Sequence, residues 1–259
     1  AYFINGGVGN ALNLIKYAGY LLGQEASWKE PAPLLKAGLY WPLLQYPRLE
    51  ELKKYWVGGN KIALITFYRA LVTSGNLKPI DALIKRLLEQ GINPLPVYVS
   101  SLKDQHSDEF IKELTLKLDI STVLNTTAFA VSSIESPAKA GPFRNTDCPV
   151  FQLILSSSEK DTWLASPTGL SPRDIAMNVA LPEVDGRLIS RAVSFKSSDE
   201  YDRKTQCSIV TYEPVPDRIS FVVNLIKNWI KLGDIPADKK RLAIILSNYP
   251  NKDSRIGNG

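Results

Sequence analysis

The spacing of apolar residues separates a helical beginning of the chain from a longer region in which strands and helices alternate. Apolar side chains recur at helical spacing over residues 10–22, which predicts an amphipathic helix. Residues 30–47 contain four prolines and predict irregular chain. A short helical pattern follows over residues 48–56. We therefore interpret residues 1–57 as a helical and irregular lead-in segment.

Short apolar runs then alternate with helical patterns. The helical patterns are expected over residues 78–90 and from Ser107 onward, and the strand-type runs over residues 61–68, 93–100, 121–126 and 150–155. Near-continuous apolar strands that alternate with helices are typical of βαβ units and of a parallel sheet that is buried on both faces. The pattern predicts an α/β subdomain over residues 58–160, with a Rossmann-like or flavodoxin-like parallel sheet and flanking helices.

Residues 161–259 predict a helix-rich connector that leads into part of a second α/β subdomain. Pro182 is expected to end a helix over residues 171–181, and a strand, a charged turn and a long amphipathic helix are expected over residues 187–196, 199–204 and 217–232. The apolar run 241–246 predicts a buried strand. A lone strand leaves its backbone unpaired, so we expect this run to be the first strand of a further subdomain, in an internal fragment of a longer chain.

Composition and charge narrow the class of protein. The chain has 259 residues, 44% of them hydrophobic, but its apolar runs are shorter than the ~18–20 residues of a membrane helix. The net charge is +5, and the basic residues are scattered rather than gathered in a stripe, which argues against nucleic-acid binding. We expect neither a membrane span nor a secretion signal.

The histidine and cysteine counts restrict the chemistry further. His106, Cys148 and Cys207 are the only residues of their types, which excludes a disulfide framework and a CxxC metal site. We expect His106 on the surface, both cysteines as small buried residues, and no metal site in this chain. The cysteine usage is typical of a cytoplasmic protein.

Candidate ligand-binding residues follow the predicted strands. In open parallel sheets, ligands bind beyond the carboxyl ends of the strands, where this sequence places Arg69, Lys103, Asn125 and the serines 156–158. Arg69 and Lys103 could hold carboxylates, and Asn125 could orient a ligand. The alternative, that such polar residues cap the next helices, stays open for Arg69 and Lys103 and is favoured for residues 156–158.

A second candidate cluster lies in the segment LPEVDGR, which brings Glu183, Asp185 and Arg187 into one turn. Paired carboxylates can transfer protons or hold a cation. The structural alternative, which the chemistry alone favours, is a charged turn in which Gly186 supplies a positive φ. The chain contains neither a GxGxxG nor a GxxxxGK[ST] motif, so we expect no ATP site in it.

Longer motifs carry a family resemblance. The segments GLSPRDIAMNVALPEVDGRLISRAVSFK (169–196) and FRNTDCPVFQLILSSSEKDTW (143–163) closely resemble the large subunits of aerobic cobaltochelatases (CobN type), which are related to the magnesium chelatase H subunits. ITFYRA (65–70), LPVYVSSLKD (95–104), GGVGN (6–10) and NYPNKDSRIGNG (248–259) fit the same family. The resemblance spans essentially the whole chain.

The resemblance implies a function. Such subunits bind a tetrapyrrole, here hydrogenobyrinic acid a,c-diamide on the route to cobalamin, and insert Co2+ into it. The ligase reaction is driven by ATP and Mg2+ in separate AAA+ partner subunits, together with integrin-like small subunits. The family's HGNLEW-type motif is absent from this chain. The resemblance therefore leaves the catalytic residues unknown, and we expect the fragment alone to be inactive and to hold no cofactor.

The resemblance suggests that the candidate residues contact the tetrapyrrole substrate. Arg69, Lys103, Asn125, Glu183, Asp185 and Arg187 are the candidate tetrapyrrole contacts, and alanine at Glu183 or Arg187 should weaken binding or chelation. Three other interpretations stay open. The chain could belong to a magnesium chelatase-type subunit acting on protoporphyrin, to a non-catalytic scaffold that docks the AAA+ partners, or to a stand-alone small-molecule receptor.

Overall fold

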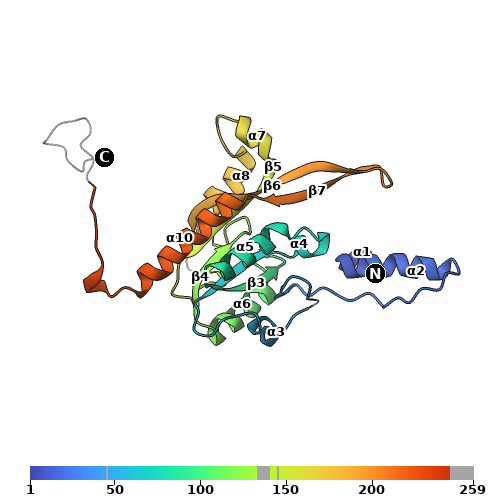
Figure 1. Cartoon of the computed structure of the whole chain (residues 1–259), viewed down its shortest axis with the longest axis horizontal. Helices are drawn as coiled ribbons and strands as arrows, with labels where there is room; N and C mark the ends of the chain where they lie inside the picture. Colours follow the sequence, from blue (N-terminus) through green and yellow to red (C-terminus); the bar gives the residue numbers. More distant parts are fainter. Residues whose placement is uncertain (45, 133–140, 145, 246–259) are drawn as a thin grey trace.

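The fold is built around one mixed sheet that helices flank. It was obtained as a computed structural model, which describes all residues except 45, 133–140, 145 and 246–259 (Figure 1). Within that part of the chain, seven strands pair in the order β1-β3-β2-β4-β5-β6-β7. Their bounds are β1 Ala37–Leu39, β2 Ile62–Tyr68, β3 Asn93–Val99, β4 Ile120–Asn125, β5 Val150–Glu159, β6 Leu188–Asp202 and β7 Cys207–Pro214.

The middle of the sheet is parallel. Strands β3, β2, β4, β5 and β6 all run in one direction, whereas β1 and β7 pair antiparallel to β3 and β6. Strand β3 is buried along its whole length and β2 at all but its two end residues, because helices cover the sheet, as the apolar runs predicted. The predicted α/β class is therefore confirmed. Strand β1 was not expected, because its three residues lie in the proline-rich stretch that predicted irregular chain.

Each helical pattern in the sequence corresponds to a helix, but the short helices at residues 69–74 and 160–165 were not expected. The bounds of the helices are α1 Tyr2–Asn5, α2 Val8–Leu21, α3 Leu49–Lys53, α4 Arg69–Ser74, α5 Lys78–Glu89, α6 Gln105–Lys117, α7 Lys160–Ala165, α8 Pro172–Ile175, α9 Leu181–Glu183 and α10 Pro216–Asp234. A π-helical turn, η1 (Ala176–Ala180), joins α8 to α9, and a 3-10 turn, η2 (Ala237–Lys239), follows α10. Helix α6 begins at Gln105 rather than at Ser107, because its N-cap is Asp104, whose carboxylate accepts the Ser107 N–H.

Helix α10 closes the core on one side of the sheet. Its buried residues Val222, Val223 and Ile226 contribute to the same apolar core as Leu64 and Phe67 of β2. Helix α10 also contacts α5, β4 and β6, so it ties the second half of the chain to the first. Neither α10 nor any other helix in the described ranges is long and apolar enough to cross a membrane.

The second half of the chain departs from expectation in several places, and strand β7 was not expected. Strand β6 pairs in parallel with β5, so the sheet of the expected 58–160 subdomain continues past residue 160. Residues 199–202, expected in a turn, extend β6 instead, and the hairpin turn to β7 comes after them. The helix expected to stop at Pro182 runs on to Glu183.

The prediction of a strand over residues 241–246 is wrong for residues 241–245, which form no strand. Residue 246 lies outside the described part. Leu242, Ile244 and Ile245 are exposed there. A strand needs a hydrogen-bonded neighbour, and none of the described residues supplies one. The start of a second subdomain therefore stays a prediction.

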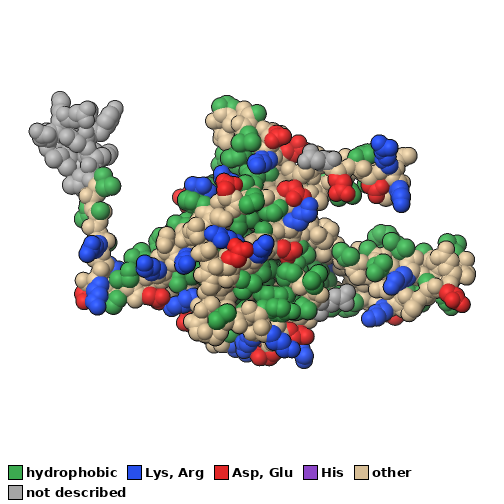
Figure 2. Space-filling model, viewed as in Figure 1, with side chains coloured by type: hydrophobic (Ala, Val, Ile, Leu, Met, Phe, Trp, Pro, Cys, Tyr) green, Lys and Arg blue, Asp and Glu red, His purple; other side chains and the backbone are tan. Residues whose placement is uncertain are grey.

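Helix α2 turns a polar side inward and an apolar side outward. Asn10 is buried, donates from Nδ2 to the carbonyl of Ala32 at 2.8 Å and accepts the Ala32 N–H at 3.0 Å. Val8, Leu12 and Ile15, which share the opposite side of the helix, are exposed. Hydrophobic side chains gather over the α1–α2 end of the molecule (Figure 2).

We expect the pKa of Tyr98, in β3, to lie well above that of an ordinary tyrosine. Its ring is buried against the backbone of Gly38, and burial raises the pKa of Tyr98 to about 12. Because the neutral hydroxyl is favoured in the folded state, Tyr98 stabilises the fold fully below about pH 10. That contribution is lost as the pH rises from about 10 to about 12. Tyrosinate absorbance should show one fewer late-titrating group in Tyr98→Phe; identical curves for the two proteins would contradict this.

Candidate functional site

The segment that follows β4 is held at almost every residue. We call residues 126–132 the β4 loop. Thr126 donates to the Thr66 carbonyl from its N–H at 2.8 Å and from its hydroxyl at 3.0 Å. The Tyr68 hydroxyl donates to the Ala128 carbonyl at 3.2 Å. These contacts tie the β4 loop to the carboxyl end of β2, which is where open parallel sheets bind ligands.

A buried polar chain runs beneath the β4 loop across three strands. The Thr66 hydroxyl donates to Asn125 Oδ1 at 2.7 Å, and Asn125 Nδ2 donates to Gln152 Oε1 at 2.7 Å. Asn125 and Gln152 both donate to the Thr127 carbonyl at 2.9 Å. Thr66, Asn125 and Gln152 are completely buried and occupy neighbouring positions in the sheet register. Buried amides are costly unless they are paired, and these pairs fix one position of the loop.

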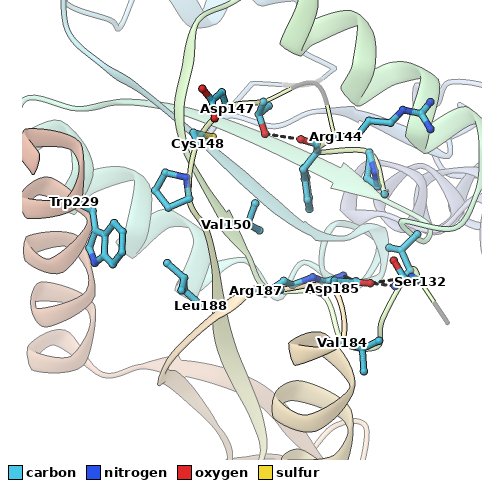
Figure 3. Close-up of a pocket in the computed structure, with 17 residues that line it drawn as sticks. Ser132, Arg144, Asp147, Cys148, Val150, Val184, Asp185, Arg187, Leu188 and Trp229 are labelled. Atoms are coloured by element: carbon cyan, nitrogen blue, oxygen red, sulfur yellow. Dashed lines mark hydrogen bonds and ion pairs between the residues drawn. The ribbon is translucent and has the colours of Figure 1, made fainter. Parts of the chain in front are cut away.

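Arg187 extends this chain to the turn after α9. Its guanidinium donates to Gln152 Oε1 at 2.9 Å and to Asp185 Oδ2 at 2.6 Å. The Asp185 carboxylate also accepts the backbone N–H groups of Val131 and Ser132, at 2.8 and 2.9 Å (Figure 3). Burial lowers the pKa of Arg187, and the Asp185 charge opposes that shift. Only 2% of the Arg187 side chain is exposed, so its charge interacts with Asp185 inside the protein.

A carbonyl that Pro182 leaves without a helical partner is another anchor for the β4 loop. In the π-turn the Leu181 N–H donates to the carbonyl of Ala176, five residues back. The same pattern would pair the N–H of residue 182 with the Met177 carbonyl, but proline has no N–H. The free Met177 carbonyl instead accepts the N–H of Phe129 at 2.9 Å. Pro182 thus does not end the helix, because the π-turn accommodates it and its missing bond is replaced by one to the loop.

Asp174 binds two serines in the second half of β5. It is buried, and its carboxylate accepts the Ser156 hydroxyl at 2.8 Å and the Ser157 N–H and hydroxyl at 3.1 and 3.0 Å. Its own N–H donates to Ser171, the N-cap of α8. Ser156 and Ser157 therefore bind the start of α8 rather than cap the helix that follows them.

A small crevice opens where β2, β3 and β4 end. Its volume is about 110 Å3, and its lining includes Tyr68, Lys103 and Phe129. Lys103 is exposed. Phe129 is 45% exposed although its backbone is hydrogen-bonded, and its φ is +68°. The crevice therefore presents an amine and an aromatic ring to solvent at the carboxyl edge of the sheet.

A larger cavity of about 690 Å3 is lined in part by the Asp185–Arg187 pair. Cys148, just before β5, and Val150, its first residue, line the cavity together with Leu188 of β6 and Trp229 of α10 (Figure 3). The cavity thus lies at the amino ends of these two strands, a position that the sequence did not predict. Burial raises the pKa of the Cys148 thiol, so Cys148 favours its neutral form there.

The six candidate residues do not form one cluster. Asn125, Asp185 and Arg187 are brought together in the polar chain beneath the β4 loop. Lys103 lines the crevice, Arg69 begins α4, and Glu183 is exposed at the end of α9. His106 is exposed as expected, but Cys207 is also exposed, contrary to expectation, because it begins β7 next to the hairpin turn.

Two network residues, Thr66 and Gln152, were missed, although the sequence carries a signal for them. Both are polar residues inside otherwise apolar strands, ITFY and VFQLIL. A buried polar group needs a partner, so such interruptions indicate a network.

The family model of the CobN/magnesium chelatases matches residues 1–259. The chain belongs to this family. It is 41% identical over 268 residues to the aerobic cobaltochelatase subunit CobN of Sinorhizobium sp, covering 100% of this chain and 21% of that protein. Identity to the CobN subunit of Pseudomonas aeruginosa is 37% over 259 residues, with the same coverage.

A solved structure agrees with this assignment. The catalytic subunit of cobaltochelatase from Mycobacterium tuberculosis matches with a TM-score of 0.72 and 27% identity, over 99% of this chain and 20% of that chain. This chain therefore spans about a fifth of the length of the family members it matches.

Proposed function

We propose that this chain is a section of the tetrapyrrole-binding large subunit of a cobalt chelatase. The reaction would form bonds between Co2+ and the ring nitrogens of hydrogenobyrinic acid a,c-diamide, which makes the whole protein a ligase. The observation that carries the proposal is the match of the CobN/magnesium chelatase family model to all residues of this chain. Cobaltochelatase relatives at 41% and 37% identity support it. Co2+ is a substrate in this account.

The proposal includes partners and a location. AAA+ and integrin-like subunits would supply ATP hydrolysis with Mg2+, in agreement with the lack of a phosphate-loop motif in this sequence. We propose a cytoplasmic complex. The chain's own contribution would be to bind and orient the ring, because the β4 loop offers a rigid surface at the ligand-binding edge of the sheet.

Metal insertion tests the proposal directly. The full-length large subunit, its two partner subunits, ATP and Mg2+ are mixed with hydrogenobyrinic acid a,c-diamide and Co2+, and the ring absorbance is followed. We expect Co2+ insertion that requires all three subunits, and no Mg2+ insertion into protoporphyrin. The reverse pair of results would favour the magnesium chelatase alternative, which the same family includes.

A second candidate function is docking of partner subunits. The exposed apolar side of α2, which carries Val8, Leu12 and Ile15, favours it. Capture of the AAA+ subunits by a full-length protein that binds no tetrapyrrole would select this function over the first.

A further inference from the structure

We propose that Phe129 is a contact surface for the face of a flat conjugated ring, and that Lys103 binds a carboxylate arm of the same ligand. The inference rests on the proposed function, since it takes that ligand to be the tetrapyrrole. It assigns the crevice at the ends of β2, β3 and β4 as part of the binding site. Asn125, Asp185 and Arg187 then act as positioning residues rather than as ligand contacts.

The position of Phe129 is over-determined by its surroundings. Its own N–H is bound to the Met177 carbonyl, and the carbonyl of the preceding Ala128 is bound to the Tyr68 hydroxyl. Two residues further on, Asp185 holds the N–H groups of Val131 and Ser132. The anchors come from β2, from the π-turn and from the turn after α9, so the loop is held from three sides.

The backbone at Phe129 is strained, and its side chain gains little burial in return. A φ of +68° is rare for a bulky residue other than glycine. Such strain persists only where the surroundings impose it, and it is concentrated at functional sites. Because 45% of Phe129 stays exposed, packing does not explain why an aromatic residue occupies this position. A rigid exposed ring suits stacking on a planar ligand.

The crevice beside Phe129 sets the chemistry of the ligand. At about 110 Å3 it is much smaller than the ~300–1,000 Å3 cavities that enclose whole ligands, so it can admit only an edge or a side arm. Lys103 on its rim is exposed and cationic, which fits a carboxylate. A planar ring with acidic side arms satisfies both features.

The test is a titration of the full-length large subunit with hydrogenobyrinic acid a,c-diamide, followed by quenching of tryptophan fluorescence. Phe129→Gly removes the ring and also relieves the positive φ, because glycine adopts it freely. We expect the Kd to rise about tenfold while the melting temperature stays equal or increases. Phe129→Trp should bind within about threefold of wild type, since it keeps a stacking surface.

Lys103→Gln should raise the Kd by about fivefold and weaken its salt dependence. Leu116→Ala, at another exposed apolar residue, is the matched control for Phe129→Gly and should bind as wild type does.

The outcomes separate this inference from the proposed function. If the wild type binds the tetrapyrrole and Phe129→Gly binds it equally well, the inference is wrong and the proposed function stands. If Phe129→Gly loses stability along with affinity, Phe129 has a structural role, and the inference is again wrong. If the wild type shows no saturable binding, both fail.

Discussion

Arg187→Ala is expected to lower the free energy of unfolding of this chain by about 3–5 kcal/mol. The substitution leaves the Asp185 carboxylate, which is 11% exposed, without its cationic partner. It also removes one donor from the buried Gln152 Oε1 and opens a cavity beside β5. Denaturant unfolding followed by circular dichroism measures the change.

Arg144→Ala is the matched control for Arg187→Ala. Arg144 lines the same cavity, but its side chain is 44% exposed and its ion pair with Asp108 is 3.7 Å long. An exposed pair of this kind contributes about 0–1 kcal/mol, so the control should unfold nearly as the wild type does. Equal losses for the two variants would show that the Arg187 network is not what holds the β4 loop.

Asp174→Ala is expected to lower the free energy of unfolding by about 3 kcal/mol. Asp174 is 2% exposed and accepts hydrogen bonds from Ser156, Ser157 and Asn178. Removing the carboxylate leaves several of these donors unpaired in the interior, at about 1–3 kcal/mol each before relaxation. The same unfolding measurement applies, with Asp161→Ala as the control, because Asp161 is an exposed acid in the first turn of α7. A loss below about 1 kcal/mol for Asp174→Ala would contradict the assigned role.

The parallel sheet could be predicted because its signal is local. Apolar runs such as 61–68 and 93–100 match β2 and β3 almost residue for residue. The Pro182 turn could not be predicted, because its stability depends on a π-turn and on Phe129, more than fifty residues away. The strand expected from residue 241 depended on a partner that the described residues do not provide.

The candidate site was predicted only in part, for a related reason. The sequence singled out Asn125 at the end of a strand, and Asp185 and Arg187 in a charged turn after a helix. Their spacing along the chain does not reveal that they bind one another rather than a ligand. Phe129 was missed because an exposed phenylalanine in a loop has no sequence signal; its backbone angle and its anchors distinguish it.

The most direct test of the account is a structure of the full-length large subunit with hydrogenobyrinic acid a,c-diamide bound. We expect the ring to lie against Phe129, one carboxylate arm to lie next to Lys103, and the Asp185–Arg187 pair to stay intact beneath the β4 loop. A ring bound elsewhere, with the crevice at the ends of β2, β3 and β4 covered by another part of the protein, would contradict it.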